Sequence, residues 1–287
     1  LDNLKHNLNE VRRVTSADVK ICAVVKADGY GHGALETAKI ALAGGASYLA
    51  VAILDEALEL RRAGIKAPIL ILGFTPEEYF DTIVEQDITQ SIYTFESAKY
   101  LSEAAQKQGK TAKVHIKLDT GMNRLGFQAG SSAVQEIEKI FKLKGLYIEG
   151  IFTHFSKADE VDPSFTKMQF ERYLSVVSSL EQAGYNIPIR HTANSAAIMQ
   201  YPETHLDMVR PGIILYGLYP SNEVAKGKLN LKPVMSFKTR VSNVKVLPKG
   251  KAISYGGAFV TQRESIIATL PVGYADGFSR LLSSKAQ

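Results

Sequence analysis

Short apolar runs alternate with longer amphipathic runs between residues 20 and 217. Eight of the apolar runs have the length and β-branched content of strands. They cover residues 21–27, 48–53, 67–74, 89–94, 112–119, 146–155, 189–195 and 208–217. Most of the runs between them place apolar residues at helical spacing. Three of these, residues 55–64, 131–145 and 165–184, end on a glycine, a typical helix stop.

Regular alternation of strands and helices predicts a parallel sheet. Eight strands fit a closed (β/α)8 barrel, and an open doubly wound sheet is the alternative. Gly29, Gly31 and Gly33 follow the first strand, but their spacing does not match the G-x-G-x-x-G fingerprint of many doubly wound sheets. We therefore predict an α/β fold with a TIM-like barrel over residues 1–222.

The pattern changes after Gly217. Residues 220–233 are polar and are typical of a linker. Beyond them, strand-like stretches are interrupted by Pro-Lys-Gly and Gly-Gly, without helical spacing. We predict an all-β domain over residues 223–287, incomplete at its end. Because the sequence begins with leucine instead of methionine, we expect a piece of a longer protein.

The fifth predicted strand, residues 112–119, has a clear two-residue period. Val114 and Leu118 belong to its apolar set, while Lys117 and Asp119 belong to the polar set. The apolar set should face the outer helices, which leaves the polar set inside the barrel. A lysine there must be paired, deprotonated or modified, because a lone buried ammonium is costly. A salt bridge to Asp119 or another carboxylate is the simple structural interpretation.

Polar residues also follow the carboxyl ends of several predicted strands, where barrels place their active sites. They are Lys26 and Tyr30; Lys117, Asp119 and Arg124; Thr153 and His154; His191, Asn194 and Ser195; and Arg210, after which come Gly212 and Ile213. A lysine after strand 1 and a phosphate position after strands 7 and 8 favour pyridoxal phosphate bound through Lys26. A lysine that merely extends into water at a strand end is the alternative for Lys26, and His191 is interpreted as a core histidine.

Composition excludes several other classes of protein. The formal net charge is +5 without a basic stripe, so nucleic-acid binding is not favoured. The single cysteine indicates a reducing compartment, and no apolar leader is seen, so we expect a cytoplasmic protein. The six histidines lack zinc-site spacing, and Ser195 lacks the G-x-S-x-G context of a serine hydrolase.

Seven motifs, in order along nearly the whole chain, resemble those of the alanine racemases, fold-type III pyridoxal-phosphate enzymes. They are AVVKADGYGHG, KLDTGMNRLGF, GIFTHFSKADE, HTANSAA, VRPGIILYGLYP, ISYGGAF and VGYADGFSR. The resemblance implies interconversion of L- and D-alanine by two bases, with D-alanine supplied for peptidoglycan. A broad-specificity or serine racemase of this fold is one alternative. A non-catalytic pyridoxal-phosphate homeostasis protein is the other, and ISYGGAF argues against it because those proteins lack the opposing tyrosine.

The same resemblance implies a role for each matching residue. Lys26 resembles the cofactor-bound base on the D-alanine face, and Tyr255 the opposing base, which acts in the partner's site of a head-to-tail homodimer. The implied cofactor-binding residues are Lys26, Tyr30, His154, Asn194, Ser195, Arg210, Gly212 and Ile213. His154 resembles a partner of Arg210. Arg124 and Tyr274 resemble substrate-binding positions, and Lys117 resembles a lysine that is often carbamylated.

The sequence departs from the family at both ends. The family has an additional N-terminal strand, a CMDQ-like segment that reaches the partner's pocket, and a late tyrosine at the phosphate. None of these is found in the present sequence. We therefore expect that a remainder of the protein completes the site.

Overall fold

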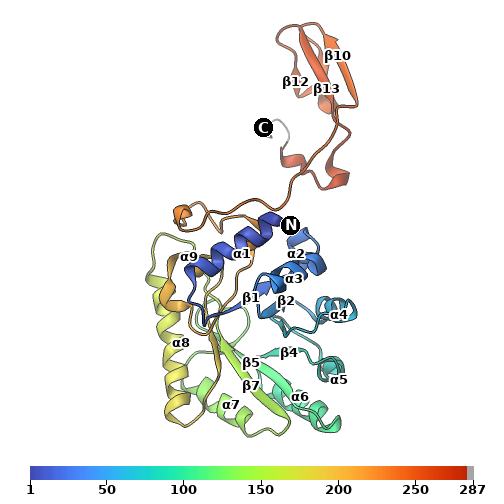
Figure 1. Ribbon diagram of the computed structural model, residues 1–287. Helices are drawn as coiled ribbons and strands as arrows, with labels where there is room; N and C mark the ends of the chain where they lie inside the picture. Colours follow the sequence, from blue (N-terminus) through green and yellow to red (C-terminus); the bar gives the residue numbers. More distant parts are fainter. Residues whose placement is uncertain (283–287) are drawn as a thin grey trace. The chain divides into compact units, whose positions relative to one another are not determined.

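A computed structural model describes residues 1–282 of the chain (Figure 1). Its internal contacts divide it into two compact units, Leu1–Met235 and Ser236–Gln287, of which the second is described up to residue 282.

The first unit is an eight-stranded parallel barrel with strand order β8-β7-β5-β4-β3-β2-β1-β9. The strands are β1 (Lys20–Val24), β2 (Tyr48–Val51), β3 (Ile69–Ile71), β4 (Thr89–Ile92), β5 (Ala112–Asp119), β7 (Leu146–Phe152), β8 (Ile189–His191) and β9 (Met208–Val209). Backbone hydrogen bonds from Asp207 N to Arg190 O (3.0 Å) and from Arg210 N to Ala193 O (2.9 Å) connect β9 to the β8 side. The barrel prediction is confirmed and the open sheet is wrong.

Several strands end earlier than predicted. The run 208–217 contributes only β9 to the sheet and then forms the 3₁₀-helix η3 (Ile213–Tyr216). The run 21–27 ends at Val24, before the short helical segment α2 (Lys26–Gly31). The added two-residue strand β6 (Phe127–Gln128) pairs with β5 outside the barrel path. At the carboxyl ends the apolar pattern continues while the backbone leaves the sheet, so the pattern alone overestimates strand length.

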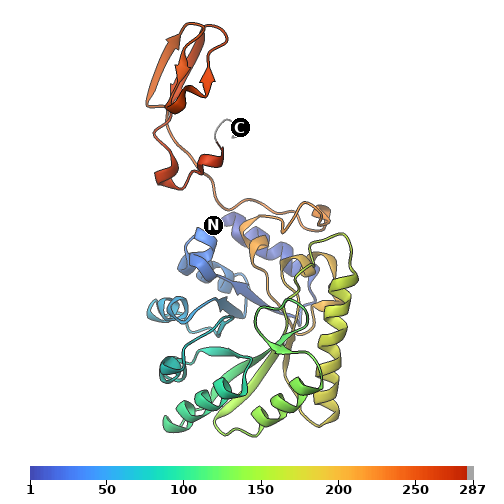
Figure 2. The ribbon, with the colours of Figure 1, turned by 180° about the vertical axis from the view of Figure 1, so that it is seen from behind.

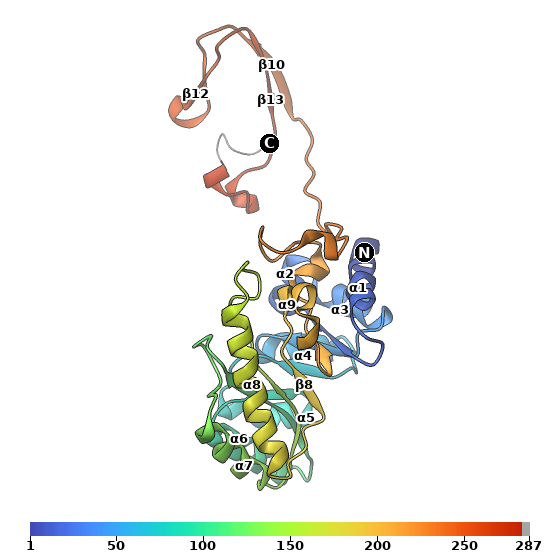
Figure 3. The ribbon, with the colours of Figure 1, turned by 90° about the vertical axis from the view of Figure 1, so that its left-hand side faces the viewer.

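Helices surround the barrel on its outside (Figures 1 and 2). They are α3 (Ala34–Ala43), α4 (Leu54–Arg62), α5 (Phe80–Glu85), α6 (Phe95–Lys107), α7 (Ser131–Phe141) and α8 (Ser164–Gln182), with the shorter α9 (Ser195–Gln200). Figure 3 shows α8 running alongside the strands. The main apolar core lies between strands and helices and includes Val114 and Leu118, as the two-residue period predicts. Lys117 and Asp119 are also buried.

Residues 220–233, predicted as a linker, are instead a packed part of the first unit. Val224 and Leu229 are buried in its core. Asn7, in helix α1 (Asp2–Val14), is buried and exchanges hydrogen bonds with the backbone of Lys232, donating to its carbonyl (2.8 Å) and accepting from its N–H (2.8 Å). Apolar residues spaced among the polar ones hold this segment on the barrel. The polar composition of the segment as a whole did not indicate this packing.

The second unit consists of two small antiparallel sheets, so the all-β prediction is confirmed. Strand β10 (Asn243–Leu247) pairs with β13 (Ser265–Thr269), and β11 (Ala252–Ile253) pairs with β12 (Phe259–Val260). The 3₁₀ turns η5 (Tyr255–Gly257) and η6 (Tyr274–Asp276) follow β11 and β13. Within residues 1–282, none of the helices has the length and apolar character needed to cross a membrane.

Candidate functional site

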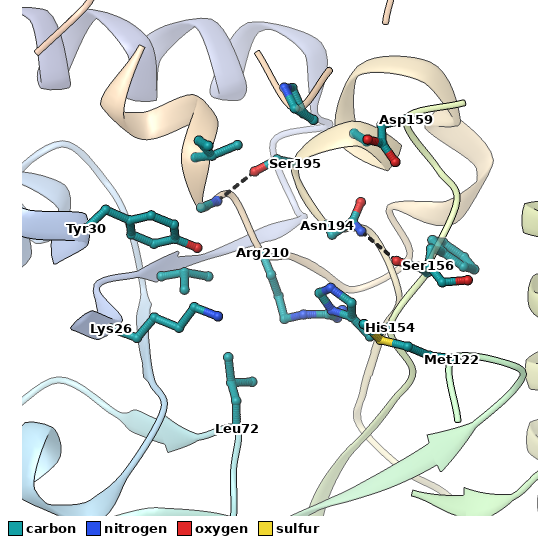
Figure 4. A pocket seen from close by; sticks show the side chains of 16 residues that line it. Lys26, Tyr30, Leu72, Met122, His154, Ser156, Asp159, Asn194, Ser195 and Arg210 are labelled. Atoms are coloured by element: carbon teal, nitrogen blue, oxygen red, sulfur yellow. Dashed lines mark hydrogen bonds between the residues drawn. The ribbon is translucent and has the colours of Figure 1, made fainter. Parts of the chain in front are cut away.

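The chain makes a left-handed turn directly after Lys26. Ala27, Asp28, Gly29 and Tyr30 have φ values of 51°, 51°, 60° and 55°. Such a conformation costs a non-glycine residue about 1–2 kcal/mol, so the surrounding structure must hold it. Asp28 Oδ1 accepts the N–H of Ala34 at 2.7 Å, which secures the far end of the turn. The turn brings Lys26 and Tyr30 to the same side, both facing the mouth of the barrel (Figure 4).

A cavity of about 360 Å³ lies at the carboxyl ends of the strands (Figure 4). All eight residues that the resemblance implied for cofactor binding line it. They are Lys26, Tyr30, His154, Asn194, Ser195, Arg210, Gly212 and Ile213. Sequence reasoning missed Leu72 and Met122, which also line the cavity. Leu72 follows β3 directly, so its position in the chain was a signal, but its apolar side chain suggested only packing.

One end of this cavity is built from backbone. Helix α9 begins at Ser195 and η3 begins at Ile213, and the first N–H groups of a helix lack intrahelical acceptors. Gly212 N donates to Ser195 Oγ at 2.9 Å, which ties the two helix starts together (Figure 4). A Cβ atom at Gly212 would lie 2.9 Å from Tyr30 Oη. Only glycine leaves this room, and the geometry suits an anionic group.

Asn194 shapes the same end of the cavity. Its Oδ1 accepts the N–H of Ala197 at 3.1 Å and so caps helix α9. Its Nδ2 donates to the carbonyl of Phe155 at 3.1 Å (Figure 4). The side chain therefore connects the segment after β7 to the start of α9.

Arg210 is a buried cation held by neutral acceptors. Its Nη1 donates to Nδ1 and to the carbonyl oxygen of His191, each at 2.9 Å. Its Nη2 donates to the carbonyls of Thr153 (2.7 Å) and Thr192 (3.1 Å). Burial lowers the pKa of Arg210 to about 10, so the guanidinium remains charged at neutral pH. A fixed positive charge thus lies at the floor of the cavity.

The imidazole that hydrogen-bonds Arg210 belongs to His191, and this corrects the expectation that His154 partners Arg210. His191 ends β8 beside the arginine, whereas His154 projects into the cavity (Figure 4). Burial, followed by the charge of Arg210, holds the pKa of His154 well below its ordinary value. His154 is therefore a neutral ring in the site. The core role expected for His191 is confirmed by its complete burial.

A second cavity, of about 220 Å³, lies beside the first and is lined by Lys26, Lys117, Arg124 and His154. Burial, then the charges of Arg124 and Arg210, lower the pKa of Lys117 to about 8. Burial and then Arg124 also lower the pKa of Lys26. Both amines are thus easier to deprotonate than ordinary lysines. The cavity collects positive charge from three side chains.

The salt bridge considered for Lys117 is not formed. The Asp119 carboxylate accepts backbone N–H groups instead, from Gly121 (2.9 Å) and Asn123 (3.0 Å) at Oδ1 and from Arg124 (3.0 Å) at Oδ2. Lys117 Nζ donates to the carbonyl of Leu72 at 3.4 Å, and among residues 1–282 it has no carboxylate within ion-pair distance. Asp119 therefore shapes the loop that carries Arg124.

The two predicted site tyrosines of the second unit lie in a cavity of their own. Tyr255 and Tyr274 line a space of about 460 Å³ with Phe259 and Phe278. Tyr255 and Tyr274 are 94% and 69% exposed. They are therefore accessible from solvent in this unit.

Comparison with known proteins agrees with this geometry. The family model for the N-terminal domain of alanine racemase matches residues 1–220, and the model for its C-terminal domain matches residues 234–287. The chain belongs to the alanine racemase family. A curated alanine racemase of Clostridium tetani is 55% identical over 285 residues, which are 99% of this chain and 73% of that protein.

Solved structures extend the likeness to three dimensions. The structure of an alanine racemase from Clostridium difficile 630 superposes with a TM-score of 0.94 at 47% identity, covering 98% of this chain and 73% of the other. A histidine racemase from Leuconostoc mesenteroides superposes with a TM-score of 0.85 at 31% identity, covering 97% and 74%. The family fold is thus shared by racemases of different amino acids.

Proposed function

We propose that this chain is an isomerase that interconverts L- and D-alanine with pyridoxal phosphate as its cofactor. One observation carries the proposal. A lysine, a fixed buried guanidinium and a backbone cradle suited to an anion converge on a single cavity at the barrel mouth. The family membership of the chain gives the same reaction class.

The residues fit the cofactor in three respects. The helix starts at Ser195 and Ile213 offer backbone N–H groups to a phosphate, and Gly212 leaves the space that a Cβ atom would fill. Arg210 would place its charge opposite the pyridine nitrogen and, being a permanent donor, would keep that nitrogen unprotonated. Lys26 would hold the aldehyde carbon of the cofactor. Tyr30, His154 and Asn194 would complete the walls.

When bound, pyridoxal phosphate supplies an electron-accepting ring that acidifies the hydrogen on the α-carbon of the amino acid. The chain must then remove that proton on one face and return one on the other. Lys26 Nζ would exchange the proton on the D-alanine face, and Tyr255 Oη would do so on the L-alanine face. The lowered pKa of Lys26, caused by burial and then by Arg124, favours the neutral amine that this step needs.

Two further residues would handle the substrate. Arg124 lies in the cavity next to Lys26, where its guanidinium would bind the substrate carboxylate. Tyr274 shares a cavity with Tyr255 and would line the entrance to the site. We also propose a head-to-tail homodimer in which Tyr255 acts in the partner's site; the exposure of its side chain supports this.

Lys117 is proposed as a carbamylated residue. A pKa near 8 leaves part of its amine neutral at physiological pH, and the neutral nitrogen can bond to the carbon of CO₂ with loss of one proton. The resulting anion would sit beside Arg124 and relieve the excess of positive charge. A ¹³C carbamate resonance after incubation with ¹³C-bicarbonate, absent in Lys117→Met, would support this assignment.

Formation of D-alanine from L-alanine tests the proposed function. The full-length protein with pyridoxal phosphate should racemise alanine, and Lys26→Ala and Tyr255→Phe should each lower the rate by orders of magnitude. Tyr147→Phe, a change at an exposed tyrosine of β7, is the matched control. Mass spectrometry after borohydride reduction should place the pyridoxyl group on Lys26. Labelling at Lys26 without any racemisation would instead indicate a cofactor carrier.

The range of amino acids that the enzyme accepts requires a second set of measurements in the same assay. The likeness to a histidine racemase shows that this fold accepts different side chains. Serine should therefore be compared with alanine by kcat/KM, and a preference for serine would replace the proposed substrate while leaving the mechanism. Cytoplasmic location remains a prediction from the single, buried cysteine, Cys22.

A further inference from the structure

A chain of buried hydrogen bonds leads away from the Arg210 side of the cavity into the barrel. His191 Nδ1 accepts from Arg210, and its Nε2 faces His115 Nδ1 at 2.8 Å. His115 Nε2 in turn faces Glu149 Oε2 at 3.2 Å. Both histidine side chains are completely buried. The chain thus joins a buried cation to a carboxylate through two imidazole rings.

The direction of every proton in this chain follows from its two ends. A guanidinium only donates, so His191 must present an unprotonated Nδ1 to Arg210 and carry its proton on Nε2. That proton points at His115, which must therefore accept at Nδ1 and carry its own proton on Nε2. This last proton reaches the oxygen of Glu149, which only accepts when ionised.

Glu149 is suited to end the chain. Tyr48 Oη donates to the same carboxylate oxygen and also contacts Thr89 Oγ1 at 2.8 Å. Burial alone would raise the pKa of Glu149, but the hydrogen bonds from His115 and Tyr48 hold it below its ordinary value. The Glu149 side chain is 17% exposed, so the anion keeps some contact with water. Arg210 itself has no carboxylate within ion-pair distance among residues 1–282.

The two imidazole rings between the charges of Arg210 and Glu149 must be neutral, and their surroundings favour the neutral form. Burial, followed by the charge of Arg210, holds the pKa of His191 well below its ordinary value. Burial likewise lowers the pKa of His115, although Glu149 opposes the shift. With one proton on each ring, only two combinations of tautomers keep the hydrogen bond between His191 and His115, and the wrong combination would direct an N–H of His191 at the guanidinium.

We propose that Glu149 is a positioning residue for the site. By accepting the Nε2 proton of His115, it holds, together with Arg210 at the other end, the tautomers of His115 and His191 in which His191 offers a lone pair to Arg210. Arg210 then keeps its orientation at the floor of the cavity. The effect on tautomers is independent of the substrate, whereas its effect on catalysis rests on the proposed function.

Tautomers can be read directly from two-bond ¹H–¹⁵N spectra of the full-length protein carrying ¹⁵N-labelled histidine and pyridoxal phosphate. We expect Nε2–H on both His115 and His191. Glu149→Gln retains an acceptor oxygen and should preserve both tautomers, whereas Glu149→Leu should shift part of the population to Nδ1–H. His205, a buried ring that contacts the carbonyl of Ile198, is the internal reference and should not change.

Controls and kinetics separate a positioning role from general damage. Glu171→Leu, at an exposed carboxylate of α8, should leave the spectra unchanged. In the racemase assay Glu149→Leu should lower kcat by about 10- to 100-fold, the range found for groups that orient metal-binding histidines, and Glu149→Gln should recover most of it. An Nδ1–H on either ring in the unsubstituted protein, or unchanged tautomers in Glu149→Leu, overturns the proposal. If Glu149→Leu does not fold, the spectrum of the unsubstituted protein still shows whether both rings carry Nε2–H. This spectrum can be interpreted even if the protein racemises no amino acid.

Discussion

Glu56 Oε1 accepts the backbone N–H of Ala27 at 2.6 Å. The carboxylate belongs to α4 and the N–H to the residue after Lys26, so the contact crosses between two βα loops of the barrel. Glu56 Oε2 also accepts the N–H groups of Ala52 (2.6 Å) and Ile53 (3.3 Å). One side chain therefore fastens the left-handed turn behind Lys26 to the end of β2.

Removing this carboxylate should release the turn. We expect Glu56→Ala to lower the free energy of unfolding by about 2 kcal/mol, because charged hydrogen bonds to backbone N–H groups are lost. Denaturant unfolding measures the change, and amide exchange should speed up at Ala27. Glu59→Ala, an exposed change on the same helix, should alter stability by less than about 0.5 kcal/mol. Equal effects of the two substitutions would contradict the fastening role.

The strain in the turn predicts a stabilising substitution. Ala27 has a φ of 51°, which glycine adopts without the clash of a Cβ atom. We expect Ala27→Gly to raise the free energy of unfolding by about 1 kcal/mol. Ala104→Gly, in the right-handed helix α6, should lower it by about 1 kcal/mol. A loss of stability in Ala27→Gly as large as that control would mean that the turn stores no strain.

Lys117 predicts a pH dependence of stability. Its pKa in the folded chain, about 8, lies below the ordinary 10.5 because of burial and then Arg124. Between these values the unfolded chain binds more protons, so the free energy of unfolding contributed by Lys117 rises with pH from about 8 to 10.5. Denaturant unfolding across this range in bicarbonate-free buffer should show a smaller rise in Lys117→Met.

The matched control for that measurement is Lys113→Met. Lys113 lies on the same strand, β5, but pairs with Asp87 at 3.1 Å near the surface. We expect that the free energy of unfolding of Lys113→Met depends on pH in the same way as that of the unsubstituted protein. At pH 7, Lys117→Met should be the more stable of the two variants, since it removes a buried cation. A steeper profile in Lys117→Met would show that the pKa is not lowered.

Substitution of Asp119 should weaken substrate binding although, within residues 1–282, the Asp119 carboxylate hydrogen-bonds only to the backbone. Its carboxylate accepts the backbone N–H groups of Gly121, Asn123 and Arg124. Asp119→Asn replaces one oxygen by an amide donor that faces an N–H, so Arg124 should lose its fixed position. We expect KM for alanine to rise about tenfold, or 1.4 kcal/mol. Asp87→Asn, at the exposed partner of Lys113, should leave KM unchanged.

Gly150 predicts a steric limit beside His115. A Cβ atom at Gly150 would lie 2.6 Å from two atoms of that buried ring. Gly150→Ala should therefore displace His115 and lower the free energy of unfolding by about 1–3 kcal/mol, as overpacking does. Gly227→Ala, where a Cβ atom has nothing within 4 Å, is the control and should be nearly neutral. A fully stable Gly150→Ala would show that the ring has room to move.

The amino-acid sequence by itself determined the architecture and most of the cavity. Periodicity identified the eight strands and, in β5, the faces of Val114 and Lys117, since successive side chains of a strand point to opposite sides. Position after strand ends, supported by the family motifs, gave eight of the residues that line the main cavity. These features are local, so a linear pattern contains them.

The tertiary structure alone decided which groups touch. Only folding brings Glu56 to Ala27, 29 residues away, and Arg210 to His191 instead of His154. The same holds for His115 and Glu149, which are 34 residues apart and look like unrelated polar positions of two strands. A hydrogen bond requires the donor–acceptor distance to be correct within a few tenths of an ångström, and it requires a suitable direction. The periodicity of a strand specifies neither for residues on different strands.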